Sequence, residues 1–507
     1  MILDLSRGWD LFRALLPEIV LTLWAMALLL DAAWRHTRPD AQRRAGVLAL
    51  VGIGLAAVAA LTLWLSNAHA FGSPGPVAVD PFRWAVDLIV LLGAALATIF
   101  SLGYLEREEI DIPEYHVMVL FAAVGMMLMA GGSDLFVIFL GLELMSVSVY
   151  VLTGIDRRSR VGGEAALKYF LLGAFASAFF LYGIALLYGA TGSTKLLVIA
   201  AQLGPLGLAG HPMLLAGMAL LFIGFGFKIA AVPFHMWTPD VYDGAPTTVT
   251  AFMAAAVKAA AFAALVRVLL QGLVGVHPDW EQVIWWLAAA TMVVGNLIAL
   301  AQKSLKRMLA YSSIAHAGYL LTALVAGSLA GAAAFLFYLL FYTLMTIGAF
   351  AILTLKGRGG ERDVLIDDLS GLSEQHPWLA FAMTVCMLSL LGFPGTAGFI
   401  GKWLILRAAT GGGYPILAAV LVVTSVVSAG YYLPVVMAMY MKPPAHDQAH
   451  AGVLVPRLAA VTLAVMVAAL LVFGLWPNLL LEAARTGSHA FAPVGLIPIS
   501  GPIPAAN

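Results

Sequence analysis

Long runs of apolar residues, each close to the length that crosses a lipid bilayer, recur along the whole of this 507-residue chain. A helix that spans the hydrocarbon core needs roughly 20 apolar residues, and inside lipid every backbone N–H and C=O group must be satisfied within the protein. Hydrophobic residues make up 62% of the chain and charged residues 11%. Soluble domains are roughly half apolar and a quarter charged. The sequence therefore predicts an all-α polytopic membrane protein.

By this measure the chain contains about fourteen predicted spans, joined by short loops without an inserted soluble domain. The spans cover residues 11–31, 45–66, 83–104, 115–131, 134–155, 162–190, 212–245, 246–270, 282–301, 307–326, 331–355, 377–409, 414–440 and 456–476. The first run is followed by arginines without a small-residue cleavage site, so we expect a spanning helix there and no cleaved signal. Residues 477–507 are expected to form a peripheral tail.

Basic residues gather in loops that follow odd-numbered spans. They are Arg35, Arg38, Arg43, Arg44, Arg157, Arg158, Arg160, Lys303, Lys306, Arg307, Lys356, Arg358, Arg362 and Lys442. Cytoplasmic loops are enriched in Lys and Arg, so the pattern predicts both termini on the outer, periplasmic side. The third loop, residues 106–114, is acidic and departs from the pattern, but acidic residues count little in this rule.

Several function classes lack their sequence signals. The formal net charge is zero, which leaves no basic surface for nucleic acid. The single cysteine, Cys386, lies in an apolar run and excludes a disulfide framework or a cysteine-ligated cluster. Paired histidines in one helix and a dinucleotide-binding glycine fingerprint are absent from the sequence. We therefore expect no metal or redox cofactor in this chain.

Two predicted spans are too long for one crossing. Residues 212–245 and 377–409 could each form a helix of roughly 50 Å, against a hydrocarbon core of about 30 Å. Prolines interrupt the first at residues 231–239, and GFPGTAG interrupts the second at Gly392–Gly398. Each break has a lysine close by, Lys228 and Lys402.

These broken helices are the seventh and twelfth predicted spans, so they cross in opposite directions. Interrupted spans at corresponding positions of two halves are typical of inverted-repeat transporters. The pattern predicts two inverted five-helix repeats, made of spans 4–8 and 9–13. We accordingly divide the chain into an N-terminal three-helix segment (1–110), a first repeat (111–272), a second repeat (273–442) and a last helix with its tail (443–507).

Four ionisable residues are predicted near the middle of the membrane: Glu143, Lys228, Lys258 and Lys402. A charge at the bilayer centre costs about 2.5–3.5 kcal/mol on insertion scales, so such residues are functional candidates by default. Glu143 lies nine residues past Asp134, about 13.5 Å into its helix, with no route to the surface. The less favoured alternatives are a neutral buried carboxyl for Glu143 and a structural ion pair for Lys258. For residues 224–260 the alternative is an ordinary loop between two helices, with lysines that snorkel to the surface.

Three further residues are weaker candidates for a proton path. Lys168 lies near a helix end, where a surface role is nearly as plausible as a functional one. His316 is slightly better explained as a hydrogen-bonded core histidine. His235 and Asp240 lie in the first break, where a structural role in the loop is favoured. Glu18, Asp31 and Asp87 are interpreted as structural.

This set of residues suits proton transport. Low-dielectric surroundings favour the neutral form of a lysine, and a nearby carboxylate favours the charged form. A lysine whose carboxylate partner approaches and withdraws can therefore bind and release a proton. Glu143 is expected to modulate Lys228, while Lys258 and Lys402, with His316, extend a chain of titratable groups across the protein.

Four stretches carry a family resemblance. KIAAVPFHMWTPDVYDGAPTTVTAF, from Lys228, closely resembles the signature of the antiporter-like membrane subunits of respiratory complex I, and its TPDVYDGAP form is similar to that of subunit N, the homologue of mitochondrial subunit 2. FLGLELMSVSVYVLTG around Glu143, SLKRMLAYSSIAHAGYLL from Ser304 and GFPGTAGFIGKW around Lys402 agree with it. The resemblance covers roughly residues 10 to 440.

The resemblance implies a fourteen-helix subunit with two inverted repeats and broken seventh and twelfth helices. Glu143 matches the family's fifth-helix glutamate, and Lys228, Lys258 and Lys402 match its seventh-, eighth- and twelfth-helix lysines. Lys168 matches a sixth-helix lysine of less settled role. The implied function is proton translocation as part of a bacterial inner-membrane NADH:quinone oxidoreductase, a translocase. NADH, FMN, iron–sulfur clusters and quinone would bind partner subunits, and the partners would be other membrane subunits, including sister antiporter-like ones.

Three alternatives remain. A multisubunit cation/proton antiporter shares the fold, but the TPDVYDGAP form argues against it. The second alternative is a related complex that takes electrons from ferredoxin, F420 or a photosynthetic donor. This sequence does not distinguish it from an NADH-dependent complex, because the electron donor binds another chain. A purely structural membrane subunit does not explain four ionisable residues near mid-depth.

Overall fold

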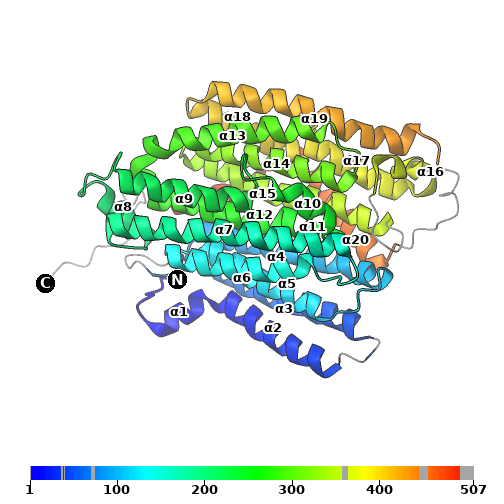
Figure 1. Cartoon of the computed structure of the whole chain (residues 1–507), viewed down its shortest axis with the longest axis horizontal. Coiled ribbons are helices and arrows are strands. Elements are labelled where there is room, and N and C mark those ends of the chain that lie inside the picture. Colours follow the sequence, from blue (N-terminus) through cyan, green and yellow to red (C-terminus); the bar gives the residue numbers. More distant parts are fainter. Residues whose placement is uncertain are drawn as a thin grey trace.

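The computed structural model describes residues 2–35, 38, 40–69, 75–356, 364–444 and 455–491 as a bundle of long helices (Figure 1). The helices are α1 (Gly8–Ala14), α2 (Leu16–Arg35), α3 (Ala41–Leu65), α4 (Pro81–Arg107), α5 (Glu114–Gly131), α6 (Leu135–Thr153), α7 (Arg160–Thr191), α8 (Leu196–Leu203), α9 (Pro212–Ile229), α10 (Trp237–Gly244), α11 (Thr247–Phe252), α12 (Lys258–Arg267), α13 (His277–Ala299), α14 (Leu305–Val325), α15 (Leu329–Lys356), α16 (Leu372–Gln375), α17 (Pro377–Leu391), α18 (Ala397–Gly411), α19 (Pro415–Met441), α20 (Arg457–Leu475) and α21 (Asn478–Ser488). The all-α membrane fold is confirmed.

Among the described residues, thirteen helices are long and apolar enough to cross a membrane. They match thirteen of the fourteen predicted spans. The remaining span, the twelfth, is divided into α17 and α18, so neither half has the full length. The eighth span changes its hydrogen-bond pattern instead of breaking, because π-helical turns at Met253–Val257 and Val268–Gly272 flank α12.

Both expected helix breaks are present, and both begin in the same way. α9 ends at Ile229, where Ala230 adopts a left-handed conformation with φ of 60°, and α17 ends at Leu391, where Gly392 has φ of 85°. Each chain then resumes as a helix, α10 or α18, after a short irregular segment. Figure 1 shows that the pair α9–α10 and the pair α17–α18 run in opposite directions, as predicted. The repeat boundaries themselves stay a prediction.

Helix starts follow local sequence signals. Asp80, Asp134, Ser159 and Ser304 each accept a backbone hydrogen bond from a residue in the first turn of the next helix. Such N-caps satisfy N–H groups that have no partner within the helix. At α4 the cap is followed directly by Pro81, whose fixed φ suits a first helical position. These caps help to position the buried charges described below.

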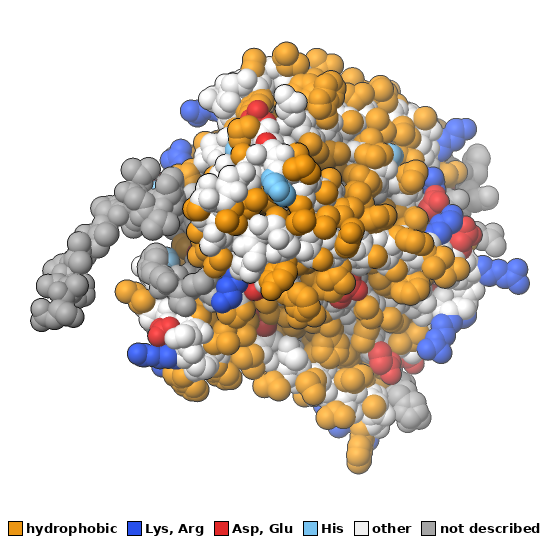
Figure 2. Space-filling model, turned by 60° about the vertical axis from the view of Figure 1, so that its left-hand side comes forward, with side chains coloured by type: hydrophobic (Ala, Val, Ile, Leu, Met, Phe, Trp, Pro, Cys, Tyr) orange, Lys and Arg blue, Asp and Glu red, His pale blue; other side chains and the backbone are white. Residues whose placement is uncertain are grey.

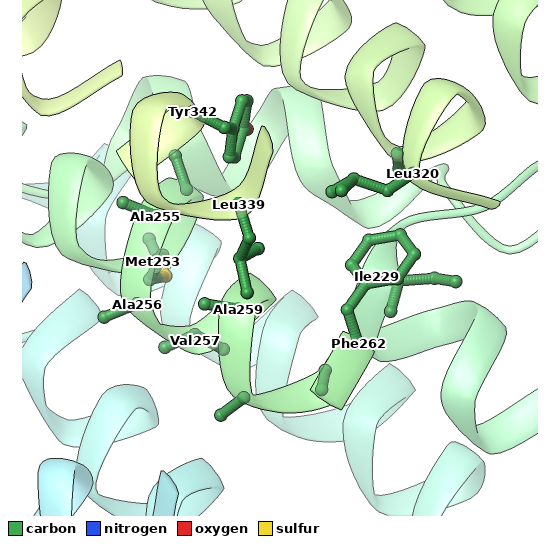
Figure 3. Packing of buried hydrophobic residues seen from close by; sticks show 14 of the residues in the cluster. Ile229, Met253, Ala255, Ala256, Val257, Ala259, Phe262, Leu320, Leu339 and Tyr342 are labelled. Atoms are coloured by element: carbon green, nitrogen blue, oxygen red, sulfur yellow. The ribbon is translucent and has the colours of Figure 1, made fainter. Parts of the chain in front are cut away.

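The core lies where α12, α14 and α15 meet the end of α9. Figure 3 shows Ala259, Phe262, Leu320, Leu339 and Ile229 gathered there. The most apolar 18-residue stretch of residues 247–272 is wholly buried inside the bundle, and the corresponding stretches of α14 and α15 nearly so. By contrast, Figure 2 shows an outer face covered by hydrophobic side chains, with charged groups gathered toward its edges. This is the surface expected of a protein surrounded by lipid.

Loops after odd-numbered spans lie close to one another. An Arg158 Nη donates to the Glu108 carbonyl at 2.7 Å, and Lys442 Nζ lies 2.6 Å from Asp367 Oδ1. One prediction was wrong: the tail is not wholly peripheral, because α21 packs against α4 and α15. Its hydrophobic residues are spaced along one helical face, and this amphipathic pattern was not recognised. Residues 492–507 of the predicted tail lie outside the described residues.

Candidate functional site

Lys228 lies in the last turn of α9, beside the first break, and only 2% of its surface is exposed. Its Nζ donates to the Tyr150 hydroxyl at 3.3 Å. The ammonium lies over the rings of Tyr150, Tyr169 and Phe227, at 5.2, 5.5 and 5.4 Å from their centroids. Aromatic faces attract a cation without neutralising it. Lys228 therefore has a polar and aromatic cage in place of a carboxylate.

Glu143 lies on α6, seven residues before Tyr150, and is half-buried. Its Oε1 is buried without a hydrogen-bond partner. Its charge acts on both Lys228 and Tyr150, so the three groups share one neighbourhood. Within the described residues, however, no ion pair of 4.0 Å or less joins Glu143 to Lys228. Tyr150 is the direct partner of the lysine, and Glu143 acts at longer range.

Lys258 is the first residue of α12 and follows the π-helical turn Met253–Val257. Its Nζ donates to the Ser313 carbonyl at 2.8 Å and also bonds to Ser313 Oγ. The Tyr342 hydroxyl donates to the same Oγ at 3.0 Å. A fully buried ammonium is thus held by one serine of α14, and its hydroxyl is shared with a tyrosine of α15.

His316 lies one turn further along α14 and is buried between two tyrosines. Its Nδ1 is 2.6 Å from the Tyr338 hydroxyl, and its Nε2 is 3.1 Å from the Tyr432 hydroxyl. The Tyr432 hydroxyl also bonds to Ser312 Oγ. A neutral imidazole donates from one nitrogen and accepts at the other, so these contacts can pass a proton in either direction. They also satisfy His316 as a core histidine.

Lys402 lies in α18, and its Nζ donates to the Leu391 carbonyl at 3.0 Å. Leu391 is the last residue of α17, so the second break supplies this acceptor. Gly392, which follows it, leaves room for the lysine stem, because a Cβ there would lie 2.9 Å from Lys402 Cδ. The ammonium also lies over the Tyr319 ring, 4.5 Å from its centroid.

One face of α14 connects two of the lysines. Ser313, His316 and Tyr319 are spaced three residues apart, which places them along one side of the helix. Ser313 binds Lys258 at one end of this row, and Tyr319 lies against Lys402 at the other. The structure therefore brings Lys258, His316 and Lys402 into one buried polar row. Lys228, with Glu143 and Tyr150, forms a second group.

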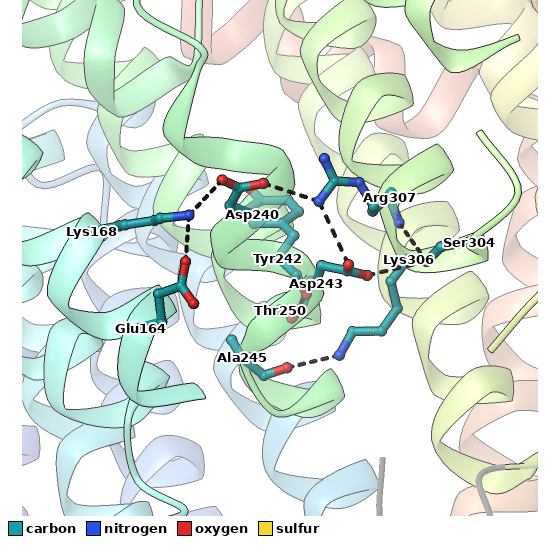
Figure 4. A network of polar contacts seen from close by, with 10 residues as sticks. All are labelled: Glu164, Lys168, Asp240, Tyr242, Asp243, Ala245, Thr250, Ser304, Lys306 and Arg307. Carbon is teal, nitrogen blue, oxygen red and sulfur yellow. Dashed lines mark hydrogen bonds and ion pairs between the residues drawn. The ribbon is translucent and has the colours of Figure 1, made fainter. Parts of the chain in front are cut away.

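Lys168 belongs to a surface network instead (Figure 4). Its Nζ lies 2.8 Å from Glu164 and 3.0 Å from Asp240, and 44% of its side chain is exposed. Asp240 also binds Arg307 at 3.0 Å, so the network ties the half-helix α10 to α7 and α14. His235, in the first break, is half-buried. These contacts agree with structural roles for Lys168 and Asp240.

Sequence reasoning missed the neutral residues that surround the lysines and His316. They are Tyr150, Tyr169, Ser312, Ser313, Tyr319, Tyr338, Tyr342 and Tyr432. Tyrosines and serines are common in apolar helices, so no spacing rule separates these from lipid-facing ones. Ser313 and Tyr319 flank His316 in a stretch already singled out, and that was the one available signal.

The sequence analysis also did not identify two arginines that the structure buries. Arg83 of α4 bonds to Glu18 Oε1 at 2.5 Å and lies 3.5 Å from Asp87. Arg267, the last residue of α12, donates to both carboxylate oxygens of Asp80, at 2.8 and 3.1 Å. Burial acts to raise the pKa of Asp80, but the Arg267 guanidinium outweighs it, and the pKa is lowered. Asp80 is therefore a stable anion.

Among the described residues, no group of three or more His, Cys, Asp or Glu side chains could hold a metal.

Two helices broken in opposite directions, a lysine beside each break, and a polar row between them define an antiporter-like membrane transporter. The chain belongs to the NADH:quinone oxidoreductase/Mrp antiporter transmembrane family, whose sequence pattern matches residues 132–428.

Its relatives narrow the family further. The chain is 49% identical to NADH-quinone oxidoreductase subunit N of Gemmatimonas aurantiaca, over 97% of this chain and 96% of the relative, and 47% identical to that of Trichlorobacter lovleyi, over 93% and 96%. A chain of respiratory complex I from Thermus thermophilus is similar in structure, with a TM-score of 0.79 and 40% identity over 93% of this chain and 100% of that one. A chain of the Mrp complex from Dietzia shares the fold, with a TM-score of 0.80 at 23% identity over 94% and 98%.

Proposed function

We propose that this chain translocates protons as subunit N of a respiratory NADH:quinone oxidoreductase, using Glu143, Lys228, Lys258 and Lys402. One observation carries the proposal: within the described residues the three lysines are buried and make no ion pair with a carboxylate. Buried charges that serve structure alone are normally paired. An amine held only by hydroxyls, carbonyls and aromatic faces can be charged or neutral at modest cost.

The geometry assigns a task to each group. Glu143 changes the affinity of Lys228 for a proton through its charge, and Tyr150 keeps the ammonium in place. Lys258 exchanges its proton with the row on α14, in which Ser313, His316 and their tyrosine partners both donate and accept hydrogen bonds. Lys402 is the far end of this row. The proton therefore moves across the second half of the chain without a charged carboxylate.

The names of the relatives indicate the redox reaction to which proton translocation by this chain is coupled. Electron transfer from NADH to quinone takes place in other subunits, which bind NADH, FMN, the iron–sulfur clusters and quinone, and this chain contributes the proton path. The chain lies in a bacterial inner membrane beside sister antiporter-like subunits. Both termini face the periplasm, because the basic loops follow odd-numbered spans. Spans 4–8 and 9–13 form the inverted repeats, within the segments 111–272 and 273–442.

The test uses Lys228→Met in the intact complex, with Lys442→Met as the matched control. Lys442 is an exposed lysine paired with Asp367, so its loss should change nothing. Proton pumping and NADH:quinone turnover are measured in membranes, and assembly is checked on the same preparation. We expect an assembled Lys228→Met complex with both activities reduced about a hundredfold or more, within the range for a positioned proton-transfer group. Unchanged pumping and turnover would contradict the proposal.

A further inference from the structure

A buried cluster of charged residues lies outside the lysine row, where the N-terminal helices meet α12. It consists of Glu18 on α2, Arg83 and Asp87 on α4, Asp80 at the cap of α4, and Arg267 at the end of α12. Glu18, Arg83 and Asp87 are almost fully removed from solvent, and Gly131 makes room for Arg83, since a Cβ there would lie 2.6 Å from Arg83 Nε.

The charges of this cluster do not balance. Three carboxyl groups, Glu18, Asp80 and Asp87, face two guanidinium groups, Arg83 and Arg267. His69 also lies near Asp80, but burial lowers the pKa of its imidazole, so it supplies no fixed positive charge. Arginine stays protonated in proteins, so full ionisation of the acids would leave one net negative charge in a buried site. An uncompensated buried charge is strongly disfavoured, and one acid can remove it by binding a proton.

Hydrogen bonding singles out Asp87. Asp80 receives two hydrogen bonds from Arg267, and Glu18 receives one from Arg83. Within the described part of the chain, neither oxygen of Asp87 has a hydrogen-bond partner, although the residue is completely buried. Arg83 Nε lies 3.5 Å from Asp87 Oδ2, and the charge of Glu18 also acts on Asp87. A buried carboxylate without hydrogen bonds is costly, whereas a protonated carboxyl is neutral and can donate one.

The cluster is connected to the lysine row by one short helix. α12 begins at Lys258 and ends at Arg267, so nine residues, or about 13.5 Å, separate the two cations. A π-helical turn adjoins each end, at Met253–Val257 and at Val268–Gly272. Such turns are frequent at functional sites in helices. A change of charge at the cluster therefore acts on a helix whose other end holds Lys258.

We propose that Asp87 binds an exchangeable proton and is a further proton-carrying residue of this chain, with Glu18 and Arg83 as its positioning partners. The inference rests on the proposed proton translocation. Asp87 lies about 9 Å along α4 from its first residue, so it is closer to one end of the bundle than the lysines are. The cluster is thus a proton-exchange point between Lys258 and that end.

The experiment compares Asp87→Asn with wild type in the purified, membrane-reconstituted complex. Asparagine has the size and neutrality of a protonated aspartate, so we expect normal assembly. In infrared spectra, the C=O band of a protonated carboxylic acid, which shifts in D2O, should be lost in the variant. Pumping and turnover should fall about a hundredfold or more, as for a positioned proton-transfer group. Asp31→Asn is the control, because Asp31 pairs with Arg35 and Arg44 at the partly exposed end of α2.

Two results would overturn the proposal. If Asp87 is an ionised structural partner of Arg83, the assembled Asp87→Asn complex will show the same carboxylic acid bands as wild type. If Asp87→Asn assembles with wild-type pumping, Asp87 takes no part in proton transfer. Lys228→Met is measured in the same series. A defect there with a silent Asp87→Asn removes only the present inference, whereas a silent Lys228→Met removes the proposed proton path itself.

Discussion

The buried cations of this chain fall into two groups that differ in their partners. Arg83 and Arg267, where α4 meets α12, each contact a carboxylate at 2.5 to 2.8 Å. Lys258 and Lys402, at the two ends of the row on α14, have only carbonyls, a hydroxyl and an aromatic ring as polar or aromatic partners among the described residues. Both groups are almost fully buried. The free-energy cost of burying a positive charge is therefore offset by a carboxylate in the arginine group and by neutral partners in the lysine group.

The difference teaches which cations can change charge. Arginine is permanently protonated and needs a permanent counterion, which Glu18 and Asp80 provide. Lysine shifts its proton affinity readily when buried, and neutral partners do not fix it in one state. A paired arginine serves to hold helices together, and an unpaired lysine beside titratable neighbours is suited to proton exchange. The predictions below test this division.

The largest effect is expected for Arg83→Met. Removing one partner of a buried ion pair leaves the other charge uncompensated and costs about 3–5 kcal/mol. Glu18 and Asp87 would lose their shared cation, so we expect little assembled complex. Assembly is measured by native electrophoresis of solubilised membranes. Lys258→Met is the comparison and should assemble normally, because its partners are neutral. Equal assembly of the two variants would contradict the division.

The next effect is expected for Lys258→Arg. Arginine keeps the positive charge but cannot release its proton under physiological conditions. If Lys258 acts by exchanging a proton, this variant should lose pumping about as fully as Lys258→Met, about a hundredfold or more. Pumping and NADH:quinone turnover are measured on assembled complex. Wild-type activity in Lys258→Arg would show that a permanent charge at this place is sufficient.

A smaller effect is expected for Tyr342→Phe. The substitution removes the hydrogen bond from the Tyr342 hydroxyl to Ser313 Oγ and leaves the amine–serine contact in place. One such bond contributes about 0.5–1.5 kcal/mol, so turnover should fall between about two- and tenfold. Tyr182→Phe is the control, since Tyr182 is an exposed tyrosine on α7. An equal fall in turnover in both variants would show that the Tyr342 hydroxyl does not contribute specifically to proton transfer along the row on α14.

Sequence reasoning succeeded where hydrophobicity and backbone chemistry decide the structure. The spans follow from apolar length, and the breaks at Ala230 and Gly392 follow from excess length combined with proline and glycine. The π-helical turns beside Lys258 and Arg267 were not predicted, because no residue in them breaks a helix. The short helix α8 was not expected either, since it is too short to span a membrane.

The sequence predicted which ionisable residues lie inside the membrane but not which side chains contact them. Depth in the membrane can be counted along a helix, which located Glu143, Lys228, Lys258 and Lys402. Which side of α14 meets Lys258 depends on how helices distant in sequence pack, and this is not encoded in local spacing. The prediction that Glu143 modulates Lys228 did not include the hydrogen bond from Lys228 to Tyr150, for the same reason. The tyrosine between them was not a titratable candidate and was passed over.

The smallest effect is expected for Lys168→Gln, which tests the division from the opposite side. Lys168 is a lysine with carboxylate partners, Glu164 and Asp240, and nearly half of its side chain is exposed. Exposed ion pairs contribute about 0–1 kcal/mol, and water can replace them. We expect normal assembly and less than about a twofold change in pumping and turnover. Because Asp240 keeps Arg307, the link between α10 and α14 should persist. If Lys168→Gln instead lost pumping as Lys228→Met should, exposure and pairing would not separate structural from proton-carrying lysines, and the proton path would have to include the network of Figure 4.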